Sequence, residues 1–172
     1  MRTGRTQMVQ QLTAEELGRI RELLEEDAIR KLAVRFTQTM DLNDLDSMIA
    51  LFTEDARCEF GHYGVWEGRE AIHEGFRARA ENNGWIPLRV LRANTNHWVE
   101  LTGATTAVGR RYLLNGASFK AKDEAPINYL GLYDEDYRKV RGDWKIARTS
   151  LHFFWPERDV GENFPAPFPP AR

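Results

Sequence analysis

The sequence holds little of what marks several large classes of protein. Its single cysteine, Cys58, excludes an internal disulfide and a cysteine-based metal cluster. Its 26 acidic and 24 basic residues nearly cancel, so the basic surface of a nucleic-acid-binding protein is not expected. No apolar run approaches the ~18 residues that a membrane span needs, and Met1 to Gln10 lack the apolar stretch of a signal peptide. These absences predict a cytoplasmic protein without a nucleic-acid or membrane partner.

What the sequence does contain fits one domain. The 172 residues lie within the ~100–200 expected of a single domain, and 42% of them are hydrophobic. We expect a flexible N-terminus over residues 1–12, one domain over 13–156 and an extended tail over 157–172. From Pro156 onward the chain holds five prolines, which favours an extended segment over a helix.

Helical patterns occupy the first half of the chain. Thr13 and Glu16 have the spacing of a capping box, which predicts a helix start. Apolar residues then recur at helical spacing as far as Asp41, with one change of phase that predicts two helices or one kinked helix. Two shorter helices are expected, one from a cap at Asn43 to about residue 52, and one over residues 68–82.

After residue 85 the apolar period changes to about two, which indicates strands. Four strands are expected, over residues 88–101, 105–114, 127–140 and 144–155. Turns are expected at Gly103, at the dipeptide Asn115-Gly116 and at residues 141–143. Helices followed by antiparallel strands predict an α+β fold.

Three segments occur in an order that is typical of one superfamily. They are residues 28–56 with DLNDLD and LFTEDA, residues 64–72 with GVWEG, and residues 131–148 with GLYDEDY and GDWKIAR. In this order they resemble the SnoaL-like group of the nuclear-transport-factor-2-like superfamily. The resemblance points most closely to the branch of scytalone dehydratase, bile-acid dehydratase and hexachlorocyclohexane dehydrochlorinase.

The resemblance implies both a fold and an activity. The implied fold is a cone, in which a strongly curved antiparallel sheet (an α+β barrel) is wrapped by three to four N-terminal helices. The implied function is that of a cofactor-independent lyase or isomerase, dehydratase-like, acting on a hydrophobic ring-containing small molecule in the cone pocket. Dehydration, dehydrohalogenation, isomerisation and cyclisation all stay open. No metal is expected either, because the acidic residues near Asp44 lack the glycine and terminal glutamate of a calcium loop.

The resemblance also singles out two candidate catalytic residues, Asp41 and Arg92. Asp41 matches the aspartate that ends the family's first long helix and partners a histidine general base. Asn96 matches a family asparagine, which places the histidine position on Arg92. Arginine cannot act as a base at neutral pH. Arg92 therefore pairs with Asp41 as an anion or carbonyl clamp, or Asp41 is the base alone, or the chain is a binding or assembly protein without turnover.

Aromatic residues supply the expected pocket lining, because ligand sites are lined mainly by apolar and aromatic groups. The alternative is that most of these residues belong to the core. His97 is expected to be a buried histidine with satisfied hydrogen bonds. The predicted substrate-binding residues are Phe36, Phe60, His62, Tyr63, Trp66, Trp85, Asn96, Tyr112, Tyr129 and Phe153.

The C-terminal aromatic residues bear on assembly. Trp155, Phe164 and Phe168 would form an apolar patch on a monomer, and such patches mark interfaces. We therefore expect a homo-oligomer, a trimer or a dimer, in which the tail covers the cone mouth or a neighbouring subunit. The alternative is a disordered tail.

Overall fold

The computed structural model describes residues 11–82, 90–117, 127–161 and 164. The expected flexible N-terminus up to Gln10, Trp85 and Phe168 lie outside the described residues. A single 3₁₀ turn, Gly61–Tyr63, stands between the first two strands. The helices are α1 (Ala14–Asp41), α2 (Leu45–Ile49) and α3 (Arg69–Asn82). The strands are β1 (Phe52–Glu59), β2 (Val65–Glu67), β3 (Val90–Leu101), β4 (Thr106–Ala117), β5 (Ile127–Val140) and β6 (Asp143–Trp155).

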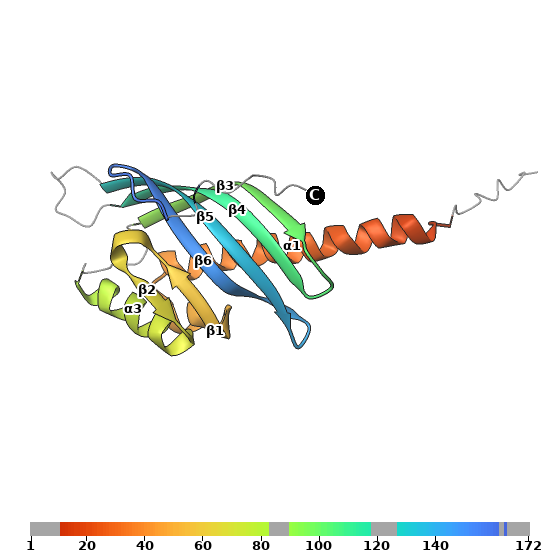
Figure 1. Ribbon diagram of the computed structural model, residues 1–172, viewed down its shortest axis with the longest axis horizontal. Coiled ribbons are helices and arrows are strands. Elements are labelled where there is room, and N and C mark those ends of the chain that lie inside the picture. The colour runs from red at the N-terminus through yellow and green to blue at the C-terminus, as the bar shows by residue number, and fades with distance from the viewer. Residues whose placement is uncertain (1–10, 83–89, 118–126, 162–163, 165–172) are drawn as a thin grey trace, which may run out of the picture.

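Helix α1 is one continuous helix of 28 residues. The expected capping box is confirmed, since the Glu16 N–H donates to the Thr13 hydroxyl and the Thr13 N–H donates to the Glu16 carboxylate. The change of phase in the apolar pattern does not mark a kink in this helix. The first half, with Leu17 and Leu24 exposed, projects beyond the sheet, and burial begins at Ile29 (Figure 1).

The second helix is shorter than expected. Its N-cap is Asp44, whose carboxylate accepts from the Ser47 N–H, while Asn43 adopts a left-handed φ of 56°. Phe52 is not helical but begins β1. Strands β1 and β2 were not predicted from the sequence. The register of β1 on β6 shifts between Phe52 and Arg57, which hides the alternation of β1.

The six strands form one open, mixed sheet in the order β2-β1-β6-β5-β4-β3. The expectation of a purely antiparallel barrel is therefore wrong in two respects. Strands β1 and β6 run parallel to each other. Both begin at the same end of the sheet, where Phe52 lies beside Ile146. The two edge strands β2 and β3 do not pair, so the sheet does not close. The three described helices also are not all N-terminal, since α3 follows β2.

The turn signals were accurate at two of three places. Thr102 donates to the Thr106 carbonyl around Gly103, and Arg141 and Gly142 turn with φ of 52° and 94°. The turn expected at Asn115-Gly116 is wrong, because both residues continue β4 and lie opposite β5. Pairing with β3 on one side and β5 on the other overrides the local preference for a turn.

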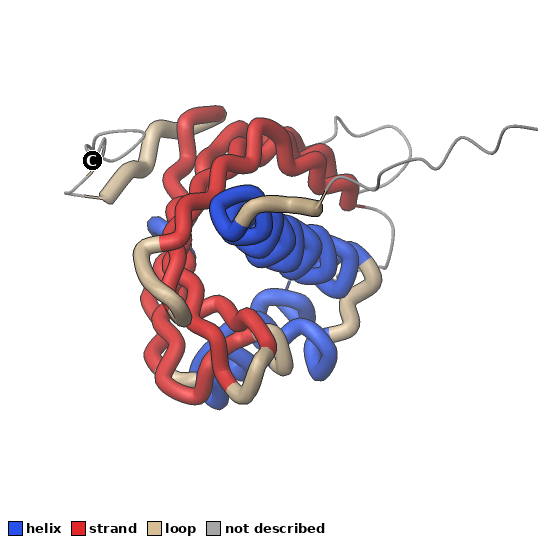
Figure 2. The backbone as a smooth tube through the Cα atoms, turned by 90° about the vertical axis from the view of Figure 1, so that its right-hand side faces the viewer, coloured by secondary structure: helices blue, strands red, loops and turns tan. Residues whose placement is uncertain are grey.

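The sheet curves around α1 (Figure 2), which packs along β3 and touches β6, while α3 packs on β1 and β2. We call the side toward α1 the inner face and the opposite side the outer face. Ile29 and Phe36 of α1 meet Tyr133, Tyr137 and Ile146 of the inner face in one hydrophobic core. Within the described ranges, no helix has both the length and the apolar character that crossing a membrane requires.

Candidate active site in the cone interior

Asp41 and Arg92 meet at the end of α1. Asp41 is the last residue of α1, and Arg92 lies near the start of β3, along which α1 packs. The Arg92 guanidinium donates a hydrogen bond to the Asp41 carboxylate. Their side chains are only 9% and 14% exposed, respectively, so the contact is largely shielded from water. No histidine of the described chain contacts Asp41, and the partner of this carboxylate is an arginine.

A second ion pair, which the sequence analysis did not predict, lies deeper in the interior. Arg111 of β4 and Glu135 of β5 are neighbours on the inner face, and both side chains are 0% exposed. The Arg111 Nε and Nη2 donate to the two Glu135 oxygens at 2.8 Å each. This two-point contact is the strongest arrangement available to an arginine and a carboxylate. The Arg111 guanidinium also stacks 4.1 Å from the centre of the Tyr133 ring.

Hydroxyl groups complete this buried pair. Tyr137 donates to Glu135 at 2.6 Å and Thr149 at 3.1 Å, so the carboxylate accepts four hydrogen bonds. Burial would raise the pKa of Glu135, but the charge and hydrogen bonds of Arg111 lower it overall. His97 lies 3.3 Å from the Tyr137 hydroxyl, and burial lowers its pKa to about 4. At neutral pH His97 is therefore uncharged, and it is partly buried, where the sequence predicted a buried histidine.

Four of the predicted binding residues form an aromatic cluster in the interior, near the C-terminal end of β6. We define it as Tyr63, Tyr129, Phe153 and His62. Phe153 lies 5.7 Å from Tyr63, 5.9 Å from Tyr129 and 5.3 Å from His62 between ring centres. The Tyr63 hydroxyl donates to the Tyr129 hydroxyl at 3.1 Å. His62 lies at the rim, where its backbone N–H and ring both contact the Asp159 carboxylate.

Arg79 of α3 joins this cluster. Its guanidinium carbon lies 3.6 Å from the centre of the Tyr63 ring, a close cation–π contact. Burial lowers the pKa of Arg79, and the charge of Arg92 lowers it further. The two arginines therefore share one interior region, although they come from α3 and β3.

Two other predicted binding residues, Phe36 and Phe60, belong to the packed core, and Trp66 is partly buried against it. Phe36 is fully buried and meets Phe52 edge-on, with ring centres 5.7 Å apart. Phe60 is buried as well, 5.4 Å from Phe76 and 6.1 Å from Trp66. Phe36 and Phe60 also pack on Tyr133 of the inner face, with ring centres 6.1 and 6.0 Å away.

Two predicted binding residues lie away from the interior. Asn96 is exposed and adopts a left-handed φ of 52° where the pairing of β3 with β4 shifts register. Tyr112 is exposed and shares strand parity with Arg110 on the outer face. Cys58 is buried and fills space in the core. Its burial raises the pKa of the thiol well above the usual value. Trp85 lies outside the described residues.

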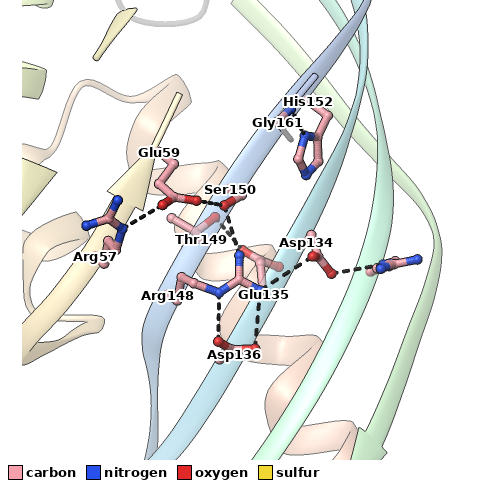
Figure 3. Close-up of polar contacts among 11 residues, drawn as sticks. Arg57, Glu59, Asp134, Glu135, Asp136, Arg148, Thr149, Ser150, His152 and Gly161 are labelled. Atoms are coloured by element: carbon pink, nitrogen blue, oxygen red, sulfur yellow. Dashed lines mark hydrogen bonds and ion pairs between the residues drawn. The ribbon is translucent and has the colours of Figure 1, made fainter. Parts of the chain in front are cut away.

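The outer face carries a separate polar network, drawn in Figure 3. Arg148 bridges Asp134 and Asp136 of β5, while Glu59 accepts hydrogen bonds from Arg57 and Ser150. Apart from Asp136, these residues line a groove of about 660 Å³ between β1, β6 and the chain near Asp159 and Phe164. Because its charges pair with one another, the groove does not resemble the apolar pocket expected from the sequence. Thr149 lies on the inner face, where it donates to Glu135, whereas its neighbour Arg148 lies on the outer face.

Among the described residues, no three histidine, cysteine or acidic side chains gather where they could hold a metal ion.

The site residues that were not predicted from the sequence were signalled by their positions. Arg111 shares strand parity with the apolar Leu113, and Arg79 falls on the α3 stripe of Ile72 and Phe76. A charged residue on an apolar face is the signal that could have found both.

Comparison with known proteins now bears on this arrangement. A family model described as the SnoaL-like domain matches residues 21–150. The chain belongs to the SnoaL-like family. The resemblance noted in the sequence is thereby confirmed. No curated protein matches the chain.

Solved structures with the same fold include three that cover most of this SnoaL-like chain. A candidate scytalone dehydratase from Novosphingobium aromaticivorans has a TM-score of 0.70 and 22% identity, over 87% of this chain and 97% of that one. The protein Rv3472 from Mycobacterium tuberculosis has a TM-score of 0.68 and 23% identity, over 86% and 83%. LinA has a TM-score of 0.69 and 15% identity, over 87% and 98%. The TM-scores show that these proteins share the fold of this chain, and at identities this low the likeness extends to the fold alone.

Proposed function

We propose that this SnoaL-like protein is a cofactor-independent lyase or isomerase that acts on a hydrophobic, ring-containing small molecule. The ligand would lie between α1, α3 and the inner face of the sheet, in contact with the aromatic cluster. Asp41 would accept or stabilise the transferred proton, and Arg92 would polarise the carbonyl or leaving-group oxygen. Relatives with the same fold that bear dehydratase names support this assignment.

The observation that carries the proposal is the contact of Asp41 with Arg92. A carboxylate and a guanidinium that touch in a shielded site bring together a proton acceptor and a hydrogen-bond donor for an oxyanion. A substrate oxygen that binds Arg92 would replace Asp41 as its partner and free the carboxylate. The histidine that family enzymes use is absent at this position, so the carboxylate acts directly.

A second candidate function is ligand binding without turnover. The same contact favours it, because in the free protein Arg92 neutralises the charge of Asp41. His97, the histidine of β3, is directed to the Tyr137 hydroxyl of the buried network and not to Asp41. The interior would then serve as a container for the ligand.

Native mass spectrometry of the protein purified from its own cells tests the proposal. We expect a co-purified apolar molecule of a few hundred daltons, whose release on denaturation identifies the substrate class. Incubation of that molecule with fresh protein then separates the two functions, since an enzyme converts it and a container returns it unchanged. A protein that carries no small molecule and binds none from a cell extract would contradict both.

We also propose that the protein is a homo-oligomer, a trimer or a dimer. Three adjacent strands present exposed apolar side chains at paired positions, Leu114 beside Leu130 and Leu130 beside Trp155. Such a row is typical of an interface. Of the tail, Phe164 packs on His152 and Phe154 of its own chain, at 4.7 and 5.6 Å between ring centres.

Leu130→Glu is expected to reduce the assembly to monomers, because it places a charge in the centre of the apolar row. Light scattering measures the subunit number directly. Leu23→Glu is the matched control, since Leu23 is also an exposed leucine but lies on the projecting part of α1. A monomeric wild-type protein, or a Leu130→Glu variant with unchanged mass, would contradict the proposed interface.

A further inference from the structure

Within the described part of the chain, Arg79 is a partly buried cation without an anionic partner. It lies on the buried stripe of α3, between Phe76 and Ala80, and its guanidinium stacks on Tyr63. Among the described residues it forms no ion pair and no hydrogen bond. Its Nε is completely removed from solvent and is one of the few buried side-chain nitrogens or oxygens without a hydrogen-bond partner. Arginine stays charged at neutral pH, so this position holds a shielded positive charge.

The other interior arginines are neutralised, which makes Arg79 the exception. Arg111 is paired with Glu135, and Arg92 with Asp41. The nearby histidine of β3, His97, is uncharged at neutral pH. The described interior therefore contains one more positive than negative charge. Buried charges are costly unless they are paired, and a cation–π contact worth about 0.5–2 kcal/mol replaces only part of an ion pair.

Two hydroxyl groups stand beside this unpaired cation. Tyr63 donates its hydroxyl proton to the Tyr129 oxygen, so Tyr129 retains its own proton to donate elsewhere. Burial raises the pKa of Tyr129 to about 12, which keeps this donor protonated under physiological conditions. The Arg79 guanidinium offers only donors and Tyr129 adds a hydroxyl donor, and donors around a positive charge favour an anion.

We propose that Arg79, with Tyr129, binds a carboxylate of the pocket ligand, so that the substrate is an aromatic or alicyclic acid and not a neutral ring. The inference rests on the proposed function, since it places the acid group of the same ligand. The ring would lie toward the Asp41–Arg92 contact, and the carboxylate would occupy the α3 end of the interior. Arg79 is then a specificity-determining residue, while Asp41 and Arg92 remain the reacting groups.

Paired probes test the charge preference. Binding of 2-naphthoate and of 2-naphthamide, which share the ring and differ in the acid group, is measured by isothermal titration calorimetry. We expect wild-type protein to bind the carboxylate about tenfold or more tightly than the amide, as a charge-assisted hydrogen bond implies. Arg79→Gln should abolish this preference and bind the amide as before. Arg77→Gln is the matched control, because Arg77 lies on the same helix but pairs with Glu74 and Glu81 on its surface.

The possible outcomes are distinct. Equal binding of the two probes to wild type, with the amide bound, overturns the inference but leaves the pocket and the proposed function standing. A preference that survives in Arg79→Gln and is lost in Arg92→Gln places the anion on Arg92 and overturns the inference as well. If neither probe binds, the proposed pocket fails and the inference fails with it.

Thermal unfolding gives an independent test that needs no ligand to start with. Arg79→Met removes the unpaired charge and keeps the packing of the side chain, so we expect Tm to rise by about 2 °C or more. In addition, 2-naphthoate should raise the Tm of wild type but not that of the variant. A variant that does not fold, or melts lower than wild type, would show that Arg79 is structural and would overturn the inference.

Discussion

Glu135→Gln is expected to lower the free energy of unfolding by about 3–5 kcal/mol, measured by urea denaturation. The substitution keeps the size of the side chain but removes its charge, and leaves Arg111 fully buried without a counter-ion. The total stability of a domain is only about 5–15 kcal/mol, so this single change removes a large part of it. Tyr137 and Thr149 also lose a charged acceptor.

Two further variants separate charge from packing. The double variant Arg111→Met with Glu135→Leu removes both charges, and we expect it to recover most of the loss because apolar replacements of a buried pair are often neutral or better. Asp136→Asn is the matched control on the outer face, where Asp136 is partly exposed to water and pairs with Arg148. It should cost less than about 1 kcal/mol. Equal losses for Glu135→Gln and Asp136→Asn would refute the role assigned to the buried pair.

The parts of the fold that the sequence predicted correctly are those fixed by near neighbours in the chain. The capping box of Thr13 and Glu16 needs only one helical turn, and the turns at Gly103 and Gly142 need only a few residues. The errors arose where distant segments decide. Asn115 and Gly116 stay in a strand because β3 and β5 pair with them, and the parallel pairing of β1 with β6 joins residues almost a hundred positions apart.

The same distinction holds for the candidate site. The family motif located Asp41 and, through the match of Asn96, Arg92, and the structure brings these two side chains together. No local pattern could pair Arg111 with Glu135, because their register depends on how β4 meets β5. Arg79 was visible as a charge on an apolar helix stripe. What the sequence could not show is that no described carboxylate comes near enough to pair with it.

Asp41→Asn is expected to lower the turnover of the co-purified ligand by about 10²–10⁴-fold, the range in which general acid–base catalysis contributes. The amide keeps the shape of the carboxylate and can still accept a hydrogen bond from Arg92, but it cannot accept a proton from carbon. Incorporation of deuterium from D₂O into the ligand, followed by mass spectrometry, reports the proton-transfer step itself. Binding of the ligand should change much less than turnover.

The control for Asp41→Asn lies three residues further along the chain. Asp44 caps α2 through the Ser47 N–H, and asparagine caps helices as well as aspartate does, so Asp44→Asn should retain both fold and turnover. Melting curves of the two variants exclude a general loss of structure. If turnover by Asp41→Asn stays within about tenfold of wild type, the carboxylate is not the base. The contact with Arg92 then serves to hold a ligand, which is the arrangement that a binding protein without turnover requires.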